Sequence, residues 1–261
     1  MPLARCIDLN CDLGEGAPND AELMPLITSA NIACGGHASD PDTMRTAVGL
    51  AIRHGVAIGA HPGLKDRESF GRRELPLTPA EVDSLVRRQI AVLDQVTRAC
   101  GGRIAHVKPH GALYNLASRD PELARAVAAA VYESDPRLVL VGLAGSRLLA
   151  AGLACGLAVA SEVFADRTYQ PDGSLTPRTW REALIEDESA ALSQVLRILR
   201  EGVVSATDGT PVAVAADTIC LHGDGPHAVA FARRLRQELA EAGVMVQAPG
   251  AGRAGLPRRH S

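Results

Sequence analysis

Aromatic residues are scarce in this chain. Phe, Trp and Tyr make up 3% of its 261 residues, which argues against a surface that stacks bases or sugar rings. The net charge is −3, so the chain lacks the excess of positive charge that nucleic acids and anionic membranes attract. Apolar runs of membrane-spanning length are missing, and no run of signal-peptide length follows the N-terminus. We therefore expect a cytoplasmic protein that binds neither nucleic acid nor a membrane.

Paired cysteines and common nucleotide-binding motifs are also missing. The six cysteines are scattered without a C-x-x-C pair, which is typical of reduced thiols rather than of a disulfide framework. No G-x-G-x-x-G follows the first apolar run, and the chain has no G-x-x-x-x-G-K-[ST] loop. These absences argue against a dinucleotide-binding fold and against a P-loop nucleotide site.

Short apolar runs alternate with amphipathic helical patterns along the chain. The runs are mostly continuous, as expected for parallel strands covered on both faces. Predicted strands cover residues 6–9, 30–33, 56–60, 104–108, 138–143, 157–162 and 218–222. Helix starts are indicated by Asp40-Pro41, by Asp120-Pro121 and by the capping box at Thr78. Further helices are predicted over 146–155, 186–201 and 226–242.

This alternation over about 250 residues favours a parallel α/β protein, and at this length a barrel. The first crossover is short and contains Pro25, so any helix there is broken. We predict an irregular, seven-stranded parallel β/α barrel, with a doubly wound open sheet as the alternative. One domain is expected over 1–248, with a long loop at 166–185 and a hairpin at 203–214. A disordered tail is expected over 249–261, where Gly, Arg and Pro are frequent.

Polar side chains gather where the predicted strands end. The carboxyl ends of parallel barrel strands meet on one face, where the active sites of this architecture lie. Taken singly, a histidine at such a place is usually structural, and Asp224 could be only a helix cap. Six clusters at equivalent places favour a shared site. They contain Asn10, Asp12 and Glu15; Asn31 and His37; His61; Lys108 and His110; Glu162, Asp166 and Arg167; and His222 and Asp224.

Lys108 is the most informative of these residues. A lysine at the end of a buried strand loses solvation, and its pKa falls unless an acid compensates. The candidate acids are Asp12, Glu15 and Glu162. A lysine and a carboxylate that face each other in a cleft can polarise a carbonyl group and orient water.

Seven motifs, taken in order, resemble the LamB/YcsF family. They are DLNCDLGE (8–15), NIACGGHA (31–38), GAHP (59–62), FGRR (70–73), VKPHGALYN (107–115), EVFADRTY (162–169) and CLHGD (220–224). The resemblance covers about residues 6–248 and implies a barrel of the glycoside hydrolase/deacetylase type. It also implies the role of the A subunit of ATP-dependent 5-oxoprolinase, which opens 5-oxoproline (pyroglutamate) to L-glutamate together with subunits B and C. Ser39 and Ser69 stand where we expect Gly from this resemblance, and Glu182 replaces another usual Gly.

The resemblance makes ATP, with Mg²⁺, the expected co-substrate, and it leaves open which subunit binds it. Our hypothesis is that Asp12 or Glu15 is the general base, and that Lys108 with His37 and His61 stabilises the developing charge. The residues expected to hold substrate are Asn10, Asn31, His110, Asp166, Arg167, His222 and Asp224, and those expected to contact phosphate are Arg72 and Arg73.

Two other functions remain open at this stage. Asp12, His37 and His61 could bind a divalent ion with one position left for water, which would indicate a metal-dependent deacetylase or amidohydrolase acting on a small amide. Alternatively, the chain could be a non-catalytic subunit whose pocket holds a ligand while its partners perform the chemistry.

Overall fold

Seven parallel strands close into a barrel in the computed structural model, which describes residues 6–223, 225 and 227–249. Around the barrel the strands follow the order β1, β2, β3, β4, β5, β6, β9, and β9 pairs again with β1. Their bounds are β1 (Cys6–Leu13), β2 (Ser29–Ala33), β3 (Ala57–His61), β4 (Ile104–Val107), β5 (Val139–Leu143), β6 (Ala158–Phe164) and β9 (Thr218–Leu221). The predicted seven-stranded barrel is confirmed. The open sheet is wrong, because β1 and β9 pair with each other instead of forming edges.

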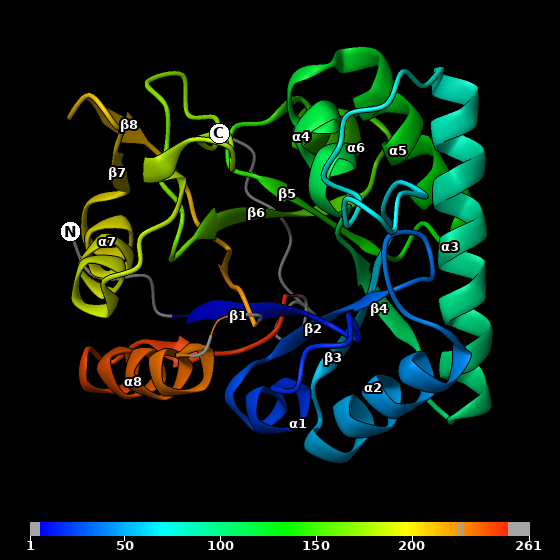
Figure 1. Ribbon diagram of the computed structural model, residues 1–261, viewed down its shortest axis with the longest axis horizontal. Coiled ribbons are helices and arrows are strands. Elements are labelled where there is room, and N and C mark those ends of the chain that lie inside the picture. Colours follow the sequence, from blue (N-terminus) through cyan, green and yellow to red (C-terminus); the bar gives the residue numbers. More distant parts are fainter. Residues whose placement is uncertain (1–5, 224, 226, 250–261) are drawn as a thin grey trace.

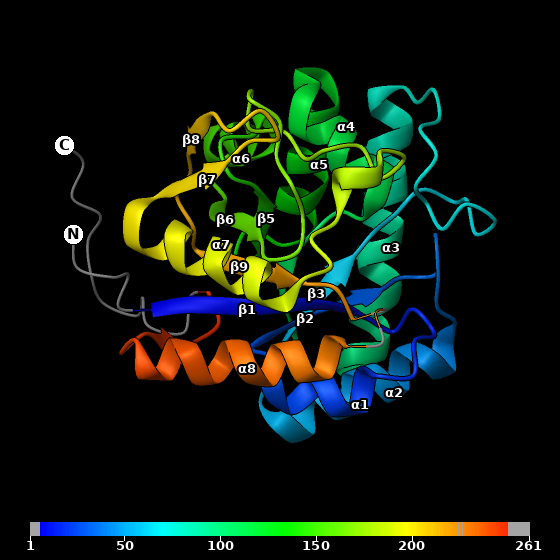
Figure 2. The same ribbon diagram turned by 60° about the vertical axis from the view of Figure 1, so that its left-hand side comes forward.

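Helices surround the strands, as Figure 1 shows. The α-helices are α1 (Asp20–Leu23), α2 (Pro41–His54), α3 (Pro79–Ala99), α4 (Gly111–Arg119), α5 (Pro121–Ser134), α6 (Arg147–Ala154), α7 (Glu188–Glu201) and α8 (Ala228–Glu241). Two 3₁₀ turns are η1 (Met24–Leu26) and η2 (Arg181–Ala183). Figures 1 and 2 both show α8 running beneath β1. Within the described ranges, no helix combines the length and the apolar character that a membrane crossing requires.

Local signals account for most of these elements. Thr78 forms the predicted capping box with Glu81, and Asp40 and Asp120 accept hydrogen bonds from the first turns of α2 and α5. The first crossover holds only the four-residue α1 and η1, because Pro25 prevents a continuous helix. The predicted hairpin is present as β7 (Val203–Ser205) and β8 (Pro211–Ala213), which pair antiparallel.

Three elements differ from the prediction. β1 continues to Leu13 rather than ending at Leu9, because its polar residues face the barrel interior and do not interrupt the ladder. Helix α4 was not predicted, because its start carries no capping signal. His110 makes no side-chain cap, and the first residue, Gly111, has φ 53° rather than a helical value. A two-residue strand, β10 (Met245–Val246), pairs with the start of β1.

The expected single domain stays a prediction, and all of the expected disordered tail except Pro249 lies outside the described residues.

The inside of the barrel is polar. Along β1, Asp8 and Asn10 are 2% exposed and bond to side chains of other strands, whereas Leu9 and Cys11 join the apolar core around the barrel. This alternation is the ordinary two-residue period of a strand. The polar face of β1 therefore lies inside the closed ring, and it can exist there only if its groups are paired.

Candidate active site

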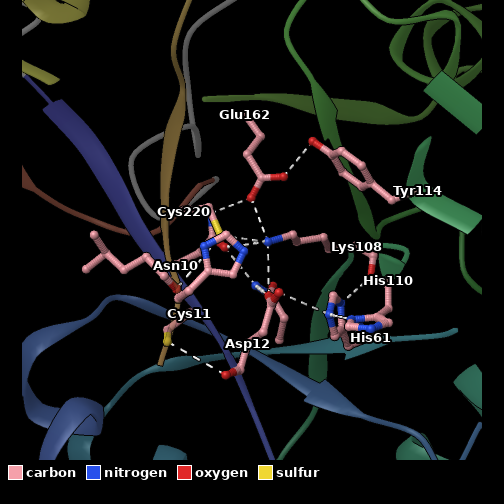
Figure 3. Close-up of polar contacts among 12 residues, drawn as sticks. Asn10, Cys11, Asp12, His61, Lys108, His110, Tyr114, Glu162 and Cys220 are labelled. Carbon is pink, nitrogen blue, oxygen red and sulfur yellow. Dashed lines mark hydrogen bonds and ion pairs between the residues drawn. The ribbon is translucent and has the colours of Figure 1, made fainter. Parts of the chain in front are cut away.

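Lys108 lies at the centre of this polar interior (Figure 3). Its Nζ is 2.8 Å from Glu162 Oε1 and 3.0 Å from Asp12 Oδ1. Burial alone would lower the pKa of Lys108, but Asp12, Cys220 and Glu162 raise it well above its usual value. Lys108 is therefore a buried cation held by two carboxylates. Asp12 and Glu162 are the compensating acids that the sequence suggested.

The two asparagines of the predicted substrate-binding set, Asn10 and Asn31, hydrogen-bond to these carboxylates. Asn10 Nδ2 donates to Glu162 Oε1 at 3.0 Å, and Asn31 Nδ2 donates to Asp12 Oδ1 at 2.8 Å. His106 Nε2 donates to Asn31 Oδ1 at 2.8 Å. Asn10 and Asn31 are 2% and 0% exposed, so they lie beneath the site and fix the position of its charged groups.

Tyr114 is a member of the site that the sequence reasoning missed. Its hydroxyl donates to Glu162 Oε2 at 2.7 Å, so both oxygens of Glu162 are engaged (Figure 3). Tyr114 comes from α4, one helical turn after His110. That i, i+4 spacing, which places two residues on one face of a helix, was the available signal, but it required the unpredicted helix.

A second cluster lies beside the first. Glu15 Oε1 is 2.8 Å from His37 Nε2, and His61 Nε2 is 2.9 Å from His110 Nδ1. One side-chain atom from each of these four residues lies within 4.8 Å of the other three. Asp12 joins the two clusters, since its Oδ2 is 3.3 Å from His61 Nε2. A set of two or more imidazoles and a carboxylate is able to hold a divalent metal ion.

The charges of this cluster follow from burial and from its neighbours. Burial together with the charge of Asp12 raises the pKa of Glu15 to about 7. Burial opposes the ionised form of Asp12, but His61 and Lys108 hold its pKa well below the usual value. Burial lowers the pKa of His37 to about 3, so this ring is neutral. Burial also disfavours a charge on His61, yet Asp12 raises its pKa above the usual value.

A pocket of about 280 Å³ opens above these clusters. This is close to the lower end of the about 300–1,000 Å³ typical of small-molecule sites. Its lining includes predicted site residues from both clusters and from the loops around them. They are Asp12, Glu15, His61, Arg72, Lys108, His110, Arg167 and His222, and Tyr114, Phe164 and Arg178 line it as well. His37 is buried behind Glu15. Asp224 lies outside the described residues.

His222 stands on the wall that the long loop covers. Its Nδ1 donates to both oxygens of Asp166, at 2.8 and 2.7 Å. Its Nε2 accepts from Arg178 Nη2 at 2.6 Å. Asp166 therefore orients His222, and Arg178 brings a cation to the pocket. No periodic pattern in the loop pointed to Arg178, so the sequence reasoning missed it.

The remaining predicted arginines occupy different positions. Arg167 is 4% exposed, and its guanidinium donates to the backbone carbonyls of Ala183 and Thr176 at 3.1 and 2.5 Å, which pins the long loop. Arg72 lines the pocket with its guanidinium carbon 5.0 Å from the centre of the Phe70 ring. Arg73 is exposed and lies 3.5 Å from Asp66. Of the predicted phosphate contacts, the structure thus brings Arg72 to the pocket.

Comparisons with known proteins agree with this architecture. The sequence model of the LamB/YcsF family matches residues 7–253. The A subunit of 5-oxoprolinase from Methylococcus capsulatus is 56% identical over 253 residues, covering 95% of this chain and 97% of that protein. The protein of the same name from Geobacillus kaustophilus is 55% identical over 249 residues, covering 94% of this chain and 97% of that protein.

Solved structures also match this chain. The lactam utilization protein of Thermus thermophilus is 46% identical and superposes with a TM-score of 0.85, covering 93% of this chain and 99% of that one. A putative cellobiose-phosphate cleavage protein of Enterococcus faecalis shares the fold alone, with 13% identity, a TM-score of 0.58 and coverage of 93% of this chain and 96% of that one. The chain belongs to the LamB/YcsF family.

Proposed function

We propose that this chain is the A subunit of an ATP-dependent 5-oxoprolinase, which opens the lactam ring of 5-oxoproline to give L-glutamate. The observation that carries the proposal is Lys108, held by Asp12 and Glu162 at the floor of a pocket that also contains arginines. The names of relatives more than 50% identical along nearly the whole chain support the same substrate. The chain would act in the cytoplasm.

The chemistry explains why ATP is needed. A lactam amide resists hydrolysis, and phosphorylation of its oxygen makes the ring carbon electrophilic. One water then adds to that carbon and gives up a proton to a base. The C–N bond breaks as a proton goes to nitrogen, and a second water displaces the phosphate. The products are glutamate, ADP and phosphate.

The pocket supplies groups for these steps. Lys108 is charged and fixed, so it stabilises the negative charge that develops on the lactam oxygen without a reorganisation cost. Asp12 and Glu15 both line the pocket and are the two candidate bases. His61 and His110 add hydrogen-bonding groups on the same wall, and His222 holds the substrate from the other side. His37 acts on Glu15 rather than on substrate.

Phosphate binding is assigned to Arg72 and Arg178. Both line the pocket, and guanidinium groups bind phosphate oxygens in a bidentate manner. Because the sequence has no P-loop, ATP with Mg²⁺ would be bound by this device, by the partner subunits B and C, or across their interface.

The test is an assay of ADP and glutamate release from 5-oxoproline and ATP, with this chain alone and with its two partner subunits. We expect glutamate only when all three are present, and we expect it to require ATP. Lys108→Met in the complex should abolish it. Glutamate formation by the complex with the same rate in that variant would remove Lys108 from the mechanism.

The alternatives give different results in the same assay. A metal-dependent amidohydrolase would release product without ATP and lose activity with a chelator. A non-catalytic binding subunit would bind 5-oxoproline, yet its pocket variants would lower only the affinity of the complex for substrate and leave kcat unchanged.

A further inference from the structure

Two imidazole nitrogens face each other beside a carboxylate on one wall of the pocket. His61 Nε2 lies 2.9 Å from His110 Nδ1. Glu15 Oε1 lies 3.8 Å from His61 Nε2 and 3.4 Å from His110 Nδ1. The three side chains come from the loop after β1, the end of β3 and the turn after β4, and all three line the pocket.

The outer nitrogens of both rings are held by backbone carbonyls. His61 Nδ1 lies 2.7 Å from the oxygen of Lys108, and His110 Nε2 lies 2.9 Å from the oxygen of Phe70. A carbonyl only accepts hydrogen bonds, so both outer nitrogens carry protons. If both rings were neutral, their inner nitrogens would be two lone pairs 2.9 Å apart, which repel each other. The pair therefore needs either a proton, which the Asp12 carboxylate 3.3 Å from His61 Nε2 favours, or a cation beside the two nitrogens.

The Phe70 carbonyl is held in place at a conformational cost. Phe70 has φ 55°, a left-handed conformation that is unfavourable for a residue with a Cβ. Such strain persists only where the surrounding structure enforces it. In this protein it directs a carbonyl at His110 and thereby fixes the tautomer that turns Nδ1 toward His61.

His37 belongs to a second layer around these groups. Its Nε2 lies 2.8 Å from Glu15 Oε1, whereas its Nδ1 is buried without a hydrogen-bond partner among the described residues. A proton on Nδ1 would leave a buried donor unsatisfied, which is costly, so the proton belongs on Nε2. A protonated nitrogen cannot bind a cation. His37 therefore donates to Glu15 and orients it.

We propose that Glu15 Oε1, His61 Nε2 and His110 Nδ1 bind one divalent transition-metal ion, with an open position toward the pocket. Two imidazoles and one carboxylate form a donor set that suits Zn²⁺ and Co²⁺. Ligand atoms at about 2.0–2.1 Å from a tetrahedral zinc ion are about 3.3 Å apart. The three distances here, 2.9, 3.4 and 3.8 Å, bracket that value.

The backbone carbonyls and His37 complete the site in the way that metal centres usually require. A histidine ligand usually donates a hydrogen bond from its other ring nitrogen, and a carboxylate ligand usually accepts one as well. These hydrogen-bond partners set the orientation and the basicity of the ligands. Engagement of Glu15 by the ion also decides between the two candidate bases. Asp12 is then the remaining candidate base, with its Oδ1 held by Lys108 and Asn31 and its Oδ2 3.3 Å from His61 Nε2.

This site does not depend on the proposed lactam chemistry, and its test uses no substrate. The full chain is stripped with a chelator and titrated with Zn²⁺ by calorimetry, and the visible absorption of Co²⁺ is recorded in parallel. We expect saturable binding of one ion per chain and a Co²⁺ spectrum of low coordination number. Anomalous diffraction from a Zn²⁺-soaked crystal of the unaltered chain should place the ion between the three ligand atoms.

For each histidine ligand, a substitution can remove the inner nitrogen that would bind the ion and keep the hydrogen bond to the backbone carbonyl. His61→Asn retains a donor for the Lys108 carbonyl but has no counterpart of Nε2. His110→Gln retains a donor for the Phe70 carbonyl but has no counterpart of Nδ1. We expect both to lose saturable binding. His37→Gln retains the donor to Glu15 and should stay within about tenfold of the wild-type affinity. His54→Gln, at an exposed position in α2, is the matched control and should bind like the wild type.

Several results would overturn the proposal. An absence of saturable Zn²⁺ and Co²⁺ binding would show that a proton alone bridges the two rings. Unchanged affinity in His61→Asn and His110→Gln, or an anomalous peak elsewhere, would place the ion outside this cluster. A loss in His37→Gln as complete as in His61→Asn would make His37 a ligand and refute its place in the second layer. Circular dichroism identifies variants that fail to fold, for which the crystal result on the unaltered chain decides.

Discussion

Lys108 Nζ and Glu162 Oε1 lie 2.8 Å apart inside the barrel, and their side chains are 3% and 0% exposed. Ion pairs taken out of water gain little net stability, but removal of one partner leaves an uncompensated buried charge. A pair of this kind, with Asp12 as a third member, therefore indicates a functional requirement more than a stabilising one. It also allows stability and activity to be separated by mutation.

Lys108→Met should lower the free energy of unfolding by about 3–5 kcal/mol, because Glu162 then remains buried without a cation and Asp12 keeps only the neighbouring His61. Lys108→Met/Glu162→Gln should recover part of that loss, since it removes the carboxylate that is left without a cation. Both variants should be inactive in the reconstituted complex. Urea denaturation and glutamate release measure the two effects. A double variant that regains activity along with stability would show that Lys108 has only a structural role.

Asp166 should act on substrate binding through His222. Asp166→Asn removes the charge that orients the ring, and we expect KM for 5-oxoproline to rise about tenfold while kcat changes little. Asp172→Asn is the matched control, because Asp172 lies in the same loop and its side-chain hydrogen bonds within the described part of the chain go to nearby Ser174. Steady-state kinetics of the complex measure both constants. An equal fall in kcat and kcat/KM would instead assign His222 to the chemical step.

His106 should make the protein less stable in acid. Burial, with Lys108 and His61 nearby, lowers the pKa of His106 to about 3, whereas an unfolded histidine has a pKa of about 6.5. Below about pH 6.5, His106 binds a proton in the unfolded chain but stays neutral in the folded chain. The free energy of unfolding therefore decreases as the pH falls from about 6.5 toward 3. Between pH 7 and pH 5 the loss is about 2 kcal/mol.

His106→Gln tests this, since Gln can still donate to Asn31 but does not titrate. Urea unfolding at pH 7 and pH 5 should show a smaller difference in free energy for the variant than for the wild type. An identical difference in both proteins would mean that His106 already takes up its proton in the folded state, or that it does not contribute to acid sensitivity.

Ser39 should be a destabilising residue. It has φ 78° directly before the α2 cap, and a residue with a Cβ pays about 1–2 kcal/mol in this conformation. Ser39→Gly, which restores the residue expected from the family resemblance, should raise the midpoint of thermal unfolding. Gly55→Ala, at φ 67° at the other end of α2, should lower it. Calorimetry compares the two, and a lower midpoint for Ser39→Gly would contradict the role given to backbone strain.

Local patterns predicted the framework of this molecule well. The caps at Asp40, Thr78 and Asp120 depend on residues within one helical turn, so they can be recognised from sequence and were all found in place. The seven apolar runs were likewise sufficient to count the barrel strands. The extent of β1 was not predictable in this way. Its polar residues suggested that the strand gives way to a solvent-exposed loop, whereas in the closed barrel they bond to residues of other strands.

The sequence by itself determined that strands and helices alternate, that polar residues cluster at strand ends, and that Lys108 needs acidic partners. Only the tertiary structure decided which of those residues line the pocket and which are buried beneath it. Asn31 hydrogen-bonds to Asp12 and His37 contacts Glu15. Tyr114 and Arg178, which were not predicted, line the pocket, and Tyr114 hydrogen-bonds to Glu162. The physical reason is that closing the barrel joins strands up to about 200 residues apart, such as β1 and β9. Hydrogen-bond partners, tautomers and burial are properties of that closure, and no stretch of sequence contains them.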